Sequence, residues 1–324
     1  MKHKIFEGKT IIIAIPNHFG FPQRFKENLE YLGFKVFLLL GDSGRIPIKD
    51  KIIHGYKKFI LGDRSHKYIV SNNIHKLHLL RQLSTIDTAE YALFIRPDLF
   101  DFEVVKRVKE LSKKVVAYQW DGMERYPLVK KYIDLFDKFY VFDSNDIAIS
   151  PKLQPTTNFY FDDILVKEKT ESKTVFFVGT YVKDRVALLE NIISKLKENN
   201  LIPKFYLFSD KKRKVSKDIK IISEYFSFEE SAMMAQRAEY MLDLHNPIHN
   251  GLSFRTFESI GYEKKLITDN SLVKAQDFYD PANIFVIGDS YEGFEDFLST
   301  SYKPLDPTIR EKYSFSNWIT QLLR

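Results

Sequence analysis

The stretch that decides the fold and the candidate site is HNPIHNGLSFRTFESIGYEKKLITDN, which runs from His245 to Asn270. It reads as a strand end, a polar loop rich in Asn, His, Gly and Ser, a short helix and a further strand. Backbone N–H groups point outward where such a loop enters a helix, and a phosphate or diphosphate prefers to bind there. Arg255 and Glu258 lie near the start of this helix, where they suit a phosphate and a sugar or ribose hydroxyl.

The composition is that of a globular protein without disulfide bonds. The chain has 324 residues, of which 44% are hydrophobic and 28% charged, enough for one large or two medium domains. No run approaches the roughly eighteen apolar residues that span a bilayer, and the first residues lack the apolar core of a signal peptide. Cysteine is absent, which excludes thiolate zinc sites and cysteine nucleophiles, so we expect a cytoplasmic protein. The net charge of +6 fits an anionic substrate, nucleic acid, or peripheral association with the inner face of the cell membrane, without choosing among them.

Short apolar runs alternate with amphipathic segments along the chain. Most runs are continuous, which is typical of parallel strands buried on both faces, and their alternation with helices predicts the α/β class. Ser227 followed by Glu230 has the spacing of a capping box at a helix start. The amphipathic segments include residues 22–32, 102–112 and 186–199. The predicted strands are residues 10–15, 36–40, 58–61, 91–95, 115–119 and 139–143 in the first half, and 174–179, 205–209, 219–223, 240–244, 266–269 and 284–287 in the second.

The strand pattern restarts at Thr174, after the polar stretch VKEKTESK of residues 166–173. This restart predicts two Rossmann-like parallel-sheet domains of roughly 150 residues each, facing a cleft. The N-terminal domain is predicted to span residues 1–165 and to bind an acceptor, and the C-terminal domain to span residues 166–305. Residues 306–324 carry apolar side chains mostly at helical spacing, which predicts a terminal helix that packs back on the body.

Ligands of doubly wound sheets bind beyond the carboxyl ends of the strands, so polar residues at those ends are candidates. In the first domain, Asn17 and His18 follow the first strand and are candidates for acceptor binding, although a connector without a role explains them equally well. The loop after the fifth strand begins with Asp121, a candidate general base or nucleophile. Glu124 is a rival carboxylate, and Arg125 can pair with either. The alternative for Asp121 is a cap on the next helix.

In the second domain, Gly179 and Thr180 end the opening strand, and small residues there let a ligand approach the backbone. Lys183 follows and can neutralise a phosphate. His245 and His249 are candidate hydrogen-bond donors to a phosphate or a sugar carboxylate. A metal site is not expected, because no pattern such as H-E-x-x-H is present. The basic run KKRK of residues 211–214 is predicted to be a solvated loop, with contact to anionic lipid or glycolipid as the alternative.

Two Rossmann-like halves, a central linker and a C-terminal return helix resemble the GT-B class of glycosyltransferases. The segment GLSFRTFESIG of residues 251–261, followed by KLITD of residues 265–269, is similar to the donor-binding segment of bacterial GT-B enzymes. This resemblance implies that Ser253, Arg255 and Thr256 hold the donor phosphate and that Glu258 takes a ribose hydroxyl. Retaining members often carry a second Glu, with seven residues between the two, and Asn250 stands at that position here.

The loop from Asp121 to Arg125 also resembles the Asp-Gly-x-x-Arg element of bacterial Kdo transferases that use a CMP-sugar, in which the Asp is assigned as the nucleophile. The resemblances imply a glycosyltransferase of bacterial surface polysaccharide or lipopolysaccharide biosynthesis that moves a sugar from a nucleotide sugar to a glycan or glycolipid. Neither metal nor cofactor is expected, because GT-B enzymes bind the donor without an obligatory metal. Two alternatives stay open, a nucleotide-sugar epimerase of the same two-lobed shape and a non-catalytic two-lobed ligand-binding protein. Nucleic acid is not an expected partner, because basic and aromatic residues are not grouped into a recognisable module.

Overall fold

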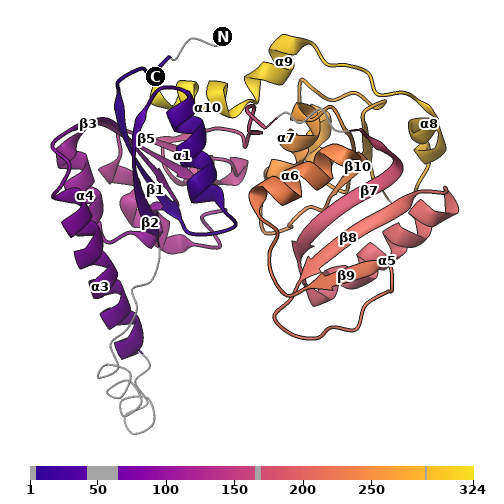
Figure 1. The fold of residues 1–324 in the computed structure, drawn as a ribbon, viewed down its shortest axis with the longest axis horizontal. Helices are drawn as coiled ribbons and strands as arrows, with labels where there is room; N and C mark the ends of the chain where they lie inside the picture. Colours follow the sequence, from indigo (N-terminus) through magenta and orange to yellow (C-terminus); the bar gives the residue numbers. More distant parts are fainter. Residues whose placement is uncertain (1–4, 42–64, 165–168, 289) are drawn as a thin grey trace, which may run out of the picture. The chain divides into compact units, whose positions relative to one another are not determined.

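The computed structural model describes residues 5–41, 65–164, 169–288 and 290–324. The chain forms two compact units, of which unit 1 comprises residues 1–156 with 322–324 and unit 2 comprises residues 157–321. Within these described ranges, each unit contains a six-stranded sheet in which every strand pair is parallel (Figure 1). The predicted α/β class with two parallel-sheet domains is therefore confirmed. The units divide after Thr156, earlier in the chain than the expected boundary near residue 165.

The sheet of unit 1 has the order β2-β1-β3-β4-β5-β6. Its strands are β1 (Thr10–Pro16), β2 (Lys35–Gly41), β3 (Ala89–Ile95), β4 (Ser112–Gln119), β5 (Lys138–Val141) and β6 (Leu153–Pro155). Its helices are α1 (Phe21–Tyr31), α3 (Ser65–Leu83) and α4 (Phe102–Leu111), with the 3-10 helices η1 (Pro97–Leu99), η2 (Pro127–Leu135) and η3 (Ser144–Ile149). The predicted strand over residues 58–61 lies outside the described residues.

Helix α4 shows how the core of unit 1 forms, because it packs an apolar stripe against the sheet. Asp101 caps α4 by accepting a hydrogen bond from the Glu103 N–H at 2.9 Å. The helix then buries Val104, Val108 and Leu111, which recur at helical spacing. Each such side chain contributes about 1.5–3 kcal/mol when fully buried. Figure 1 shows α3 lying alongside α4, with which it is in contact.

The sheet of unit 2 has the order β12-β11-β10-β7-β8-β9. Its strands are β7 (Glu171–Thr180), β8 (Ile202–Phe208), β9 (Ile219–Ile222), β10 (Ala238–Asp243), β11 (Lys265–Thr268) and β12 (Ile284–Val286). Its helices are α5 (Lys183–Glu198), α6 (Phe228–Arg237), α7 (Phe254–Gly261), α8 (Phe294–Ser299), α9 (Pro307–Lys312) and α10 (Phe315–Leu323), with the 3-10 helix η4 (Ser271–Ala275). The capping box predicted from Ser227 and Glu230 is confirmed at the start of α6. None of the described helices combines the length and the apolar character that a membrane crossing requires.

The C-terminal segment forms two helices, α9 and α10, where the sequence pattern predicts one. The interruption has a backbone cause, because the Tyr160 N–H donates to the Tyr313 carbonyl at 3.0 Å and the Phe315 N–H donates to the Tyr160 carbonyl at 2.8 Å. Tyr160 and Ser314 thereby form an isolated parallel bridge between the two helices. Most of α10 belongs to unit 2, while residues 322–324 belong to unit 1.

An aromatic cluster anchors the start of α7 to this segment. The Phe159 ring lies 5.2 Å from Phe254, the first residue of α7, and 4.3 Å from Trp318 on α10. Phe315 packs on Phe159 at 5.1 Å. Aromatic pairs of this kind contribute about 0.5–1.5 kcal/mol beyond the area that they bury. The first residue of α7 is therefore packed, through Phe159, against the C-terminal helix α10.

Replacement of Gly261 tests this packing. A Cβ atom at Gly261 would lie 2.3 Å from the Cγ and Cδ2 atoms of the buried Tyr160 ring. We expect Gly261→Ala to lower the free energy of unfolding by about 1–3 kcal/mol in urea titrations, because the ring has to move. Gly288→Ala is the matched control, since no atom of the other described residues outside its chain neighbours lies within 4 Å of the position that its methyl group would take. Equal stability of the two variants would contradict the tight contact.

Candidate functional site

The predicted phosphate-binding loop follows β10, in the middle of the unit 2 sheet. β10 ends at Asp243, and the loop leads to Ser253, which caps α7. The neighbouring strand β7 ends at Thr180 and is followed by α5. Arg185 on α5 donates from Nη2 to the His245 carbonyl at 3.1 Å. The two loops that the sequence predicts to bind the donor are therefore adjacent and joined by a hydrogen bond.

Two buried asparagines fix the orientation of the loop. Asn158 donates from Nδ2 to the Leu252 carbonyl at 2.9 Å, and Asn270 donates from Nδ2 to the Gly251 carbonyl at 3.0 Å. Because a carbonyl and the following N–H point in opposite directions across a trans peptide, the N–H groups of Leu252 and Ser253 point away from these asparagines. They precede the first turn of α7, whose N–H groups have no partner within the helix. Backbone N–H groups in such a position are of the kind that bind anions in other proteins.

The buried carboxylate of Asp243 is hydrogen-bonded to side chains at the start of α7. Asp243 accepts a hydrogen bond from Thr256 Oγ1 at 3.0 Å and another from the Ser253 side chain. Burial raises the pKa of Asp243, while these hydroxyls and the nearby Arg255 act to lower it. Thr256 is 1% exposed, so its hydroxyl serves Asp243 rather than facing a ligand. Its position thus differs from the phosphate contact that the resemblance implies.

Arg255 and Glu258 form an ion pair on the same helix. Arg255 Nη1 lies 2.7 Å from Glu258 Oε2, but the contact is not aligned as a hydrogen bond. The guanidinium lies over the Phe176 ring, with its central carbon 5.3 Å from the ring centroid. Burial raises the pKa of Glu258, and the charge of Arg255 opposes this shift. The pair therefore places one cation and one carboxylate at the start of α7.

The other predicted donor residues surround this site at different depths. The His245 N–H donates to Asp269 Oδ1 at 2.5 Å, and the His249 N–H donates to the Asn246 carbonyl at 2.9 Å. Asn250 is half-buried in the same loop. Gly179 and Thr180 end β7, and Lys183 is the exposed first residue of α5, which has no side-chain N-cap. All the predicted donor residues belong to unit 2.

The predicted acceptor residues of unit 1 lie in a tight turn after β1. Asn17 and His18 are exposed, and the Phe21 N–H donates to the His18 carbonyl at 3.0 Å. The turn needs two left-handed residues, and Phe19 (φ 54°) and Gly20 (φ 76°) supply them. Phe21 then packs on Trp120, with ring centroids 5.4 Å apart. This contact brings the loop after β1 next to the loop that carries Asp121.

Asp121 lies at the carboxyl end of β4 in a network of charges. Arg96 donates from Nη1 to Asp121 Oδ2 at 2.9 Å, and Arg125 Nη1 lies 3.6 Å from Asp121 Oδ1. Glu124 is exposed and has no ion pair with a described residue. The next helix, η2, begins after Tyr126 without a side-chain cap, so Asp121 does not cap it. Sequence reasoning missed Arg96 as a partner, although the Arg-Pro-Asp that follows an apolar strand was a usable signal.

The loop after β4 is anchored at Met123 by a backbone hydrogen bond to Asp146. The Met123 N–H donates to Asp146 Oδ2 at 2.9 Å, and the Met123 side chain is fully buried. Burial raises the pKa of Asp146, and the Met123 hydrogen bond acts against that shift. The loop that carries Asp121 is therefore anchored at Met123.

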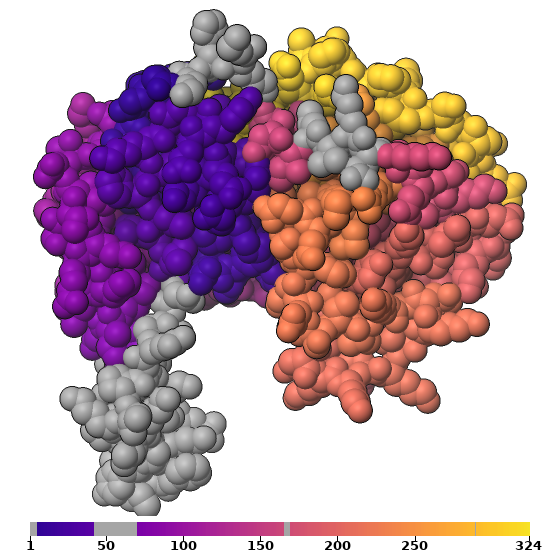
Figure 2. All heavy atoms as spheres, in the orientation of Figure 1, coloured from indigo at the N-terminus to yellow at the C-terminus, as the bar shows by residue number. Residues whose placement is uncertain are grey.

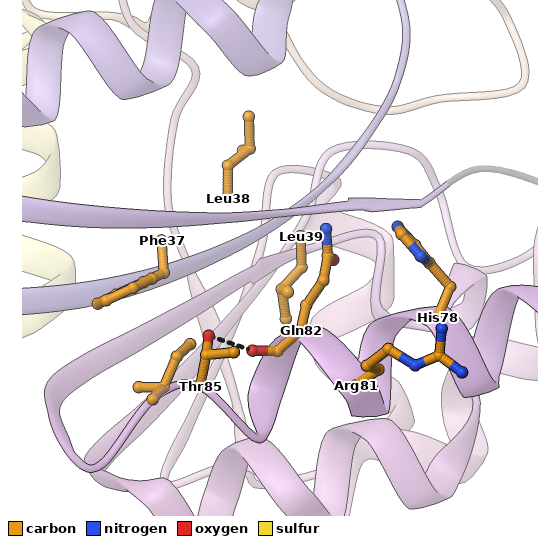
Figure 3. A pocket seen from close by; sticks show the side chains of 8 residues that line it. Phe37, Leu38, Leu39, His78, Arg81, Gln82 and Thr85 are labelled. Atoms are coloured by element: carbon orange, nitrogen blue, oxygen red, sulfur yellow. Dashed lines mark hydrogen bonds between the residues drawn. The ribbon is translucent and has the colours of Figure 1, made fainter.

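Two pockets in the described part of the chain lie elsewhere. One of about 370 Å³ lies between β2 and α3, and Figure 3 shows Phe37 and Leu39 facing His78 and Gln82 across it. The other, of about 500 Å³, lies beside β12 and α8. No predicted site residue lines either pocket. Across the described ranges, no group of three or more His, Asp or Glu side chains gathers as metal ligands.

The basic run after β8 is an exposed loop. Lys211, Lys212 and Lys214 form no ion pair with any residue that the structure describes, and the loop follows the lower edge of unit 2 in Figure 2. Arg213 differs, because its guanidinium carbon lies 4.4 Å from the Tyr181 ring centroid and its Nε donates to Ser209 Oγ at 3.0 Å. The prediction of a solvated loop thus agrees with the exposure of the three lysines.

Solved structures share this two-unit architecture over nearly the full chain. A UDP-forming α,α-trehalose-phosphate synthase from Burkholderia xenovorans is 10% identical with a TM-score of 0.59, and the match covers 97% of each chain. An α-glucosyltransferase, solved with UDP and a 13-mer DNA, is 12% identical with a TM-score of 0.57, covering 99% of this chain and 98% of that one. A UDP-GlcNAc 2-epimerase from Methanocaldococcus jannaschii is 12% identical with a TM-score of 0.50, covering 97% and 99%.

No protein-family profile matches the sequence, and no curated protein matches it. The structural similarities establish the fold, which is that of the GT-B class with two Rossmann-like domains. At 10–12% identity they do not establish the chemistry, since one fold serves many reactions. The activity has to be argued from the residues of the two loops.

The raised pKa of Glu258 gives a testable dependence of stability on pH. The folded state binds this proton more tightly than the unfolded chain, so the wild type gains stability as the pH falls through the folded pKa toward the ordinary value of 4.5. We expect the stability of the wild type relative to Glu258→Gln to increase between pH 8 and pH 5 in urea titrations. Glu198→Gln, on an exposed part of α5, is the control for the substitution itself. A constant difference between the wild type and Glu258→Gln would contradict this role of burial.

Proposed function

We propose that this protein is a nucleotide-sugar-dependent glycosyltransferase. The observation that carries the proposal is the start of α7, where Asn158 and Asn270 bind the carbonyls of Leu252 and Gly251, so that the N–H groups of Leu252 and Ser253 point away from these asparagines. Beside these N–H groups lies Arg255, a cation whose close ion pair lacks hydrogen-bond alignment. Amide donors and one arginine at a helix N-terminus suit the diphosphate of a nucleotide sugar.

Unit 2 would bind the donor and stabilise its leaving group. When the glycosidic bond to the diphosphate breaks, negative charge builds up on the departing phosphate, and preorganised N–H groups and cations lower the energy of that charge. Arg255 would shift from Glu258 to the phosphate, which frees the Glu258 carboxylate to accept a ribose hydroxyl. Lys183, at the uncapped start of α5, would add a second positive charge.

Unit 1 would bind the acceptor. Asp121, on its supported loop, would act as general base toward an acceptor hydroxyl, or as nucleophile if the reaction passes through a covalent intermediate. Asn17 and His18 would contact the acceptor from the neighbouring turn. We further propose a glycan or glycolipid acceptor in bacterial surface polysaccharide synthesis, without a metal, with the exposed lysines after β8 suited to an anionic membrane surface.

Binding of UDP tests the donor site, because one structural neighbour is a UDP-forming enzyme and another was solved with UDP. We expect UDP to raise the melting temperature of the wild type, since a ligand that binds only the folded state stabilises it. Replacement Arg255→Met should weaken UDP binding roughly 10- to 100-fold in calorimetric titrations, the range expected for loss of a charge-assisted hydrogen bond.

The control for this substitution is Arg310→Met, which removes an arginine of unit 2 that pairs with Glu263 on the surface. GDP, CMP and dTDP belong in the same panel, so that a preference for CMP would select the donor class of the Kdo transferases. Unchanged UDP affinity in Arg255→Met would remove the start of α7 from the donor site.

Substitution of Asp121 tests the acceptor side. We expect Asp121→Ala to reduce sugar transfer by about 10²–10⁴-fold while nucleotide affinity stays nearly intact, because the residue acts on the acceptor. Glu124→Gln should have a small effect, and Asp134→Asn, an exposed aspartate paired with Lys152, is the control. Retained transfer in Asp121→Ala would refute the assignment of this residue.

The epimerase alternative is favoured by one observation, the full-length similarity to a UDP-GlcNAc 2-epimerase. Epimerisation needs no acceptor, whereas transfer does. Analysis of the products of UDP-GlcNAc with and without saccharide acceptors separates the two reactions, and an epimerised nucleotide sugar formed without acceptor would favour the alternative.

A further inference from the structure

Arg96 adopts a backbone conformation that long side chains rarely take. It follows β3 with φ 57° and ψ 68°, in the left-handed region. A non-glycine residue held there costs on the order of 1 kcal/mol or more, so the surroundings have to compensate. Part of the compensation is a hydrogen bond from the Arg96 N–H to the Tyr118 carbonyl on β4 at 3.2 Å, and Pro97 starts η1 directly after the turn.

The turn directs the Arg96 side chain onto two carboxylates. Nε and Nη2 donate to the two oxygens of Asp98, each at 2.8 Å, and Nη1 donates to Asp121 Oδ2 at 2.9 Å. A guanidinium is planar and rigid, so the bidentate grip of Asp98 fixes the plane of the group and with it the position of Nη1. Asp98 thus orients Arg96, and Arg96 in turn sets the place of the Asp121 carboxylate.

An aromatic ring covers the exposed face of this contact. The guanidinium carbon of Arg96 lies 3.5 Å from the centroid of the Tyr126 ring, and Tyr126 belongs to the same loop as Asp121. A cation so close to a ring face is attracted to it, and exclusion of water strengthens the neighbouring ion pairs. Burial acts to lower the pKa of Arg96, but the hydrogen bonds and charges of Asp98 and Asp121 outweigh it and raise the pKa. Arg96 therefore stays charged.

We propose that Arg96 is a positioning residue that holds the Asp121 carboxylate in its reactive orientation, with Asp98 as the group that orients Arg96. The Arg96 guanidinium contacts two carboxylates and the Tyr126 ring, so it acts through Asp121 rather than on the substrate. The inference rests on the proposed function, because the orientation of Asp121 matters only if Asp121 acts on an acceptor. It adds two residues, Arg96 and Asp98, to the acceptor side of the site.

The test compares two conservative variants, whose folding is checked by circular dichroism and thermal unfolding. Arg96→Lys keeps the charge but loses the rigid fork, and Asp98→Asn keeps Arg96 but weakens the grip that orients it. We expect both to lower kcat by about 10- to 100-fold, because misplacement of a reacting group by about 1 Å has effects of this size. The KM for the nucleotide sugar should change less than about twofold, since the donor residues lie in unit 2.

Arg107→Lys is the matched control, because Arg107 lies on the exposed face of α4 and pairs only with Glu110 among the described residues. Its kcat should equal that of the wild type. Chemical rescue provides a readout that a purely structural role would not move. In Arg96→Gly, the new glycine tolerates the left-handed backbone conformation. This variant should lose activity and regain part of it when methylguanidinium is added.

An active wild type whose kcat is unchanged in Arg96→Lys and Asp98→Asn would overturn this inference alone. An equal loss of kcat and of nucleotide affinity would also overturn it, because a residue that acts through Asp121 on the acceptor leaves donor binding unchanged. A wild type that turns over no nucleotide sugar would instead overturn the proposed function, and this inference with it.

Discussion

Parallel strands that are buried on both faces leave no room for unpaired polar side chains along their length, so polar chemistry is confined to the strand ends. β10 reaches its last residue at the carboxylate Asp243, and β4 is followed two residues later by Asp121. Each carboxylate then needs partners. Asp243 accepts hydrogen bonds from the hydroxyls of Ser253 and Thr256, and Asp121 accepts one from the guanidinium of Arg96. The burial of the sheets thus creates both candidate sites and orders the loops around them.

The two units use arginine in different ways. Arg96 is held by three hydrogen bonds to carboxylates and covered by a ring, so its position is fixed. Among the described residues, Arg255 forms an ion pair with the carboxylate of Glu258, and that contact lacks hydrogen-bond alignment. An arginine with several fixed hydrogen bonds keeps its neighbour in place, whereas Arg255 could reach a ligand only by leaving the buried Glu258 carboxylate. The geometry therefore fixes Arg96 more firmly than Arg255.

Much of the fold follows from local pattern, because continuous apolar runs such as residues 10–15 and 240–244 have few alternatives to a buried strand. The three-residue strand β6 is too short to leave a pattern, and the split between α9 and α10 depends on Tyr160, which is distant in sequence. The candidate carboxylate Asp121 was predictable, since it closely follows a strand. The Arg-Pro-Asp sequence marks Arg96 as a polar residue at a strand end. Its pairing with Asp121 could not be predicted, because that contact depends on a left-handed turn and on β3 and β4 being neighbours. The inward position of Thr256 could not be predicted from the sequence for another reason. Residues 256–261 of α7 are all buried, so the pattern of apolar residues does not tell the inner face of this helix from its outer face.

The division of α10 between the two units has a practical consequence for dissecting the chain. Lys114 on β4 donates from Nζ to the Leu323 carbonyl at 3.1 Å, so the last residues complete unit 1 although unit 2 precedes them. A fragment that ends at Thr156 lacks these residues, and a fragment that starts at Thr157 carries them without their neighbours. One break in the polypeptide therefore cannot yield two whole halves, and separate expression would require circular permutation or transplantation of the final helix.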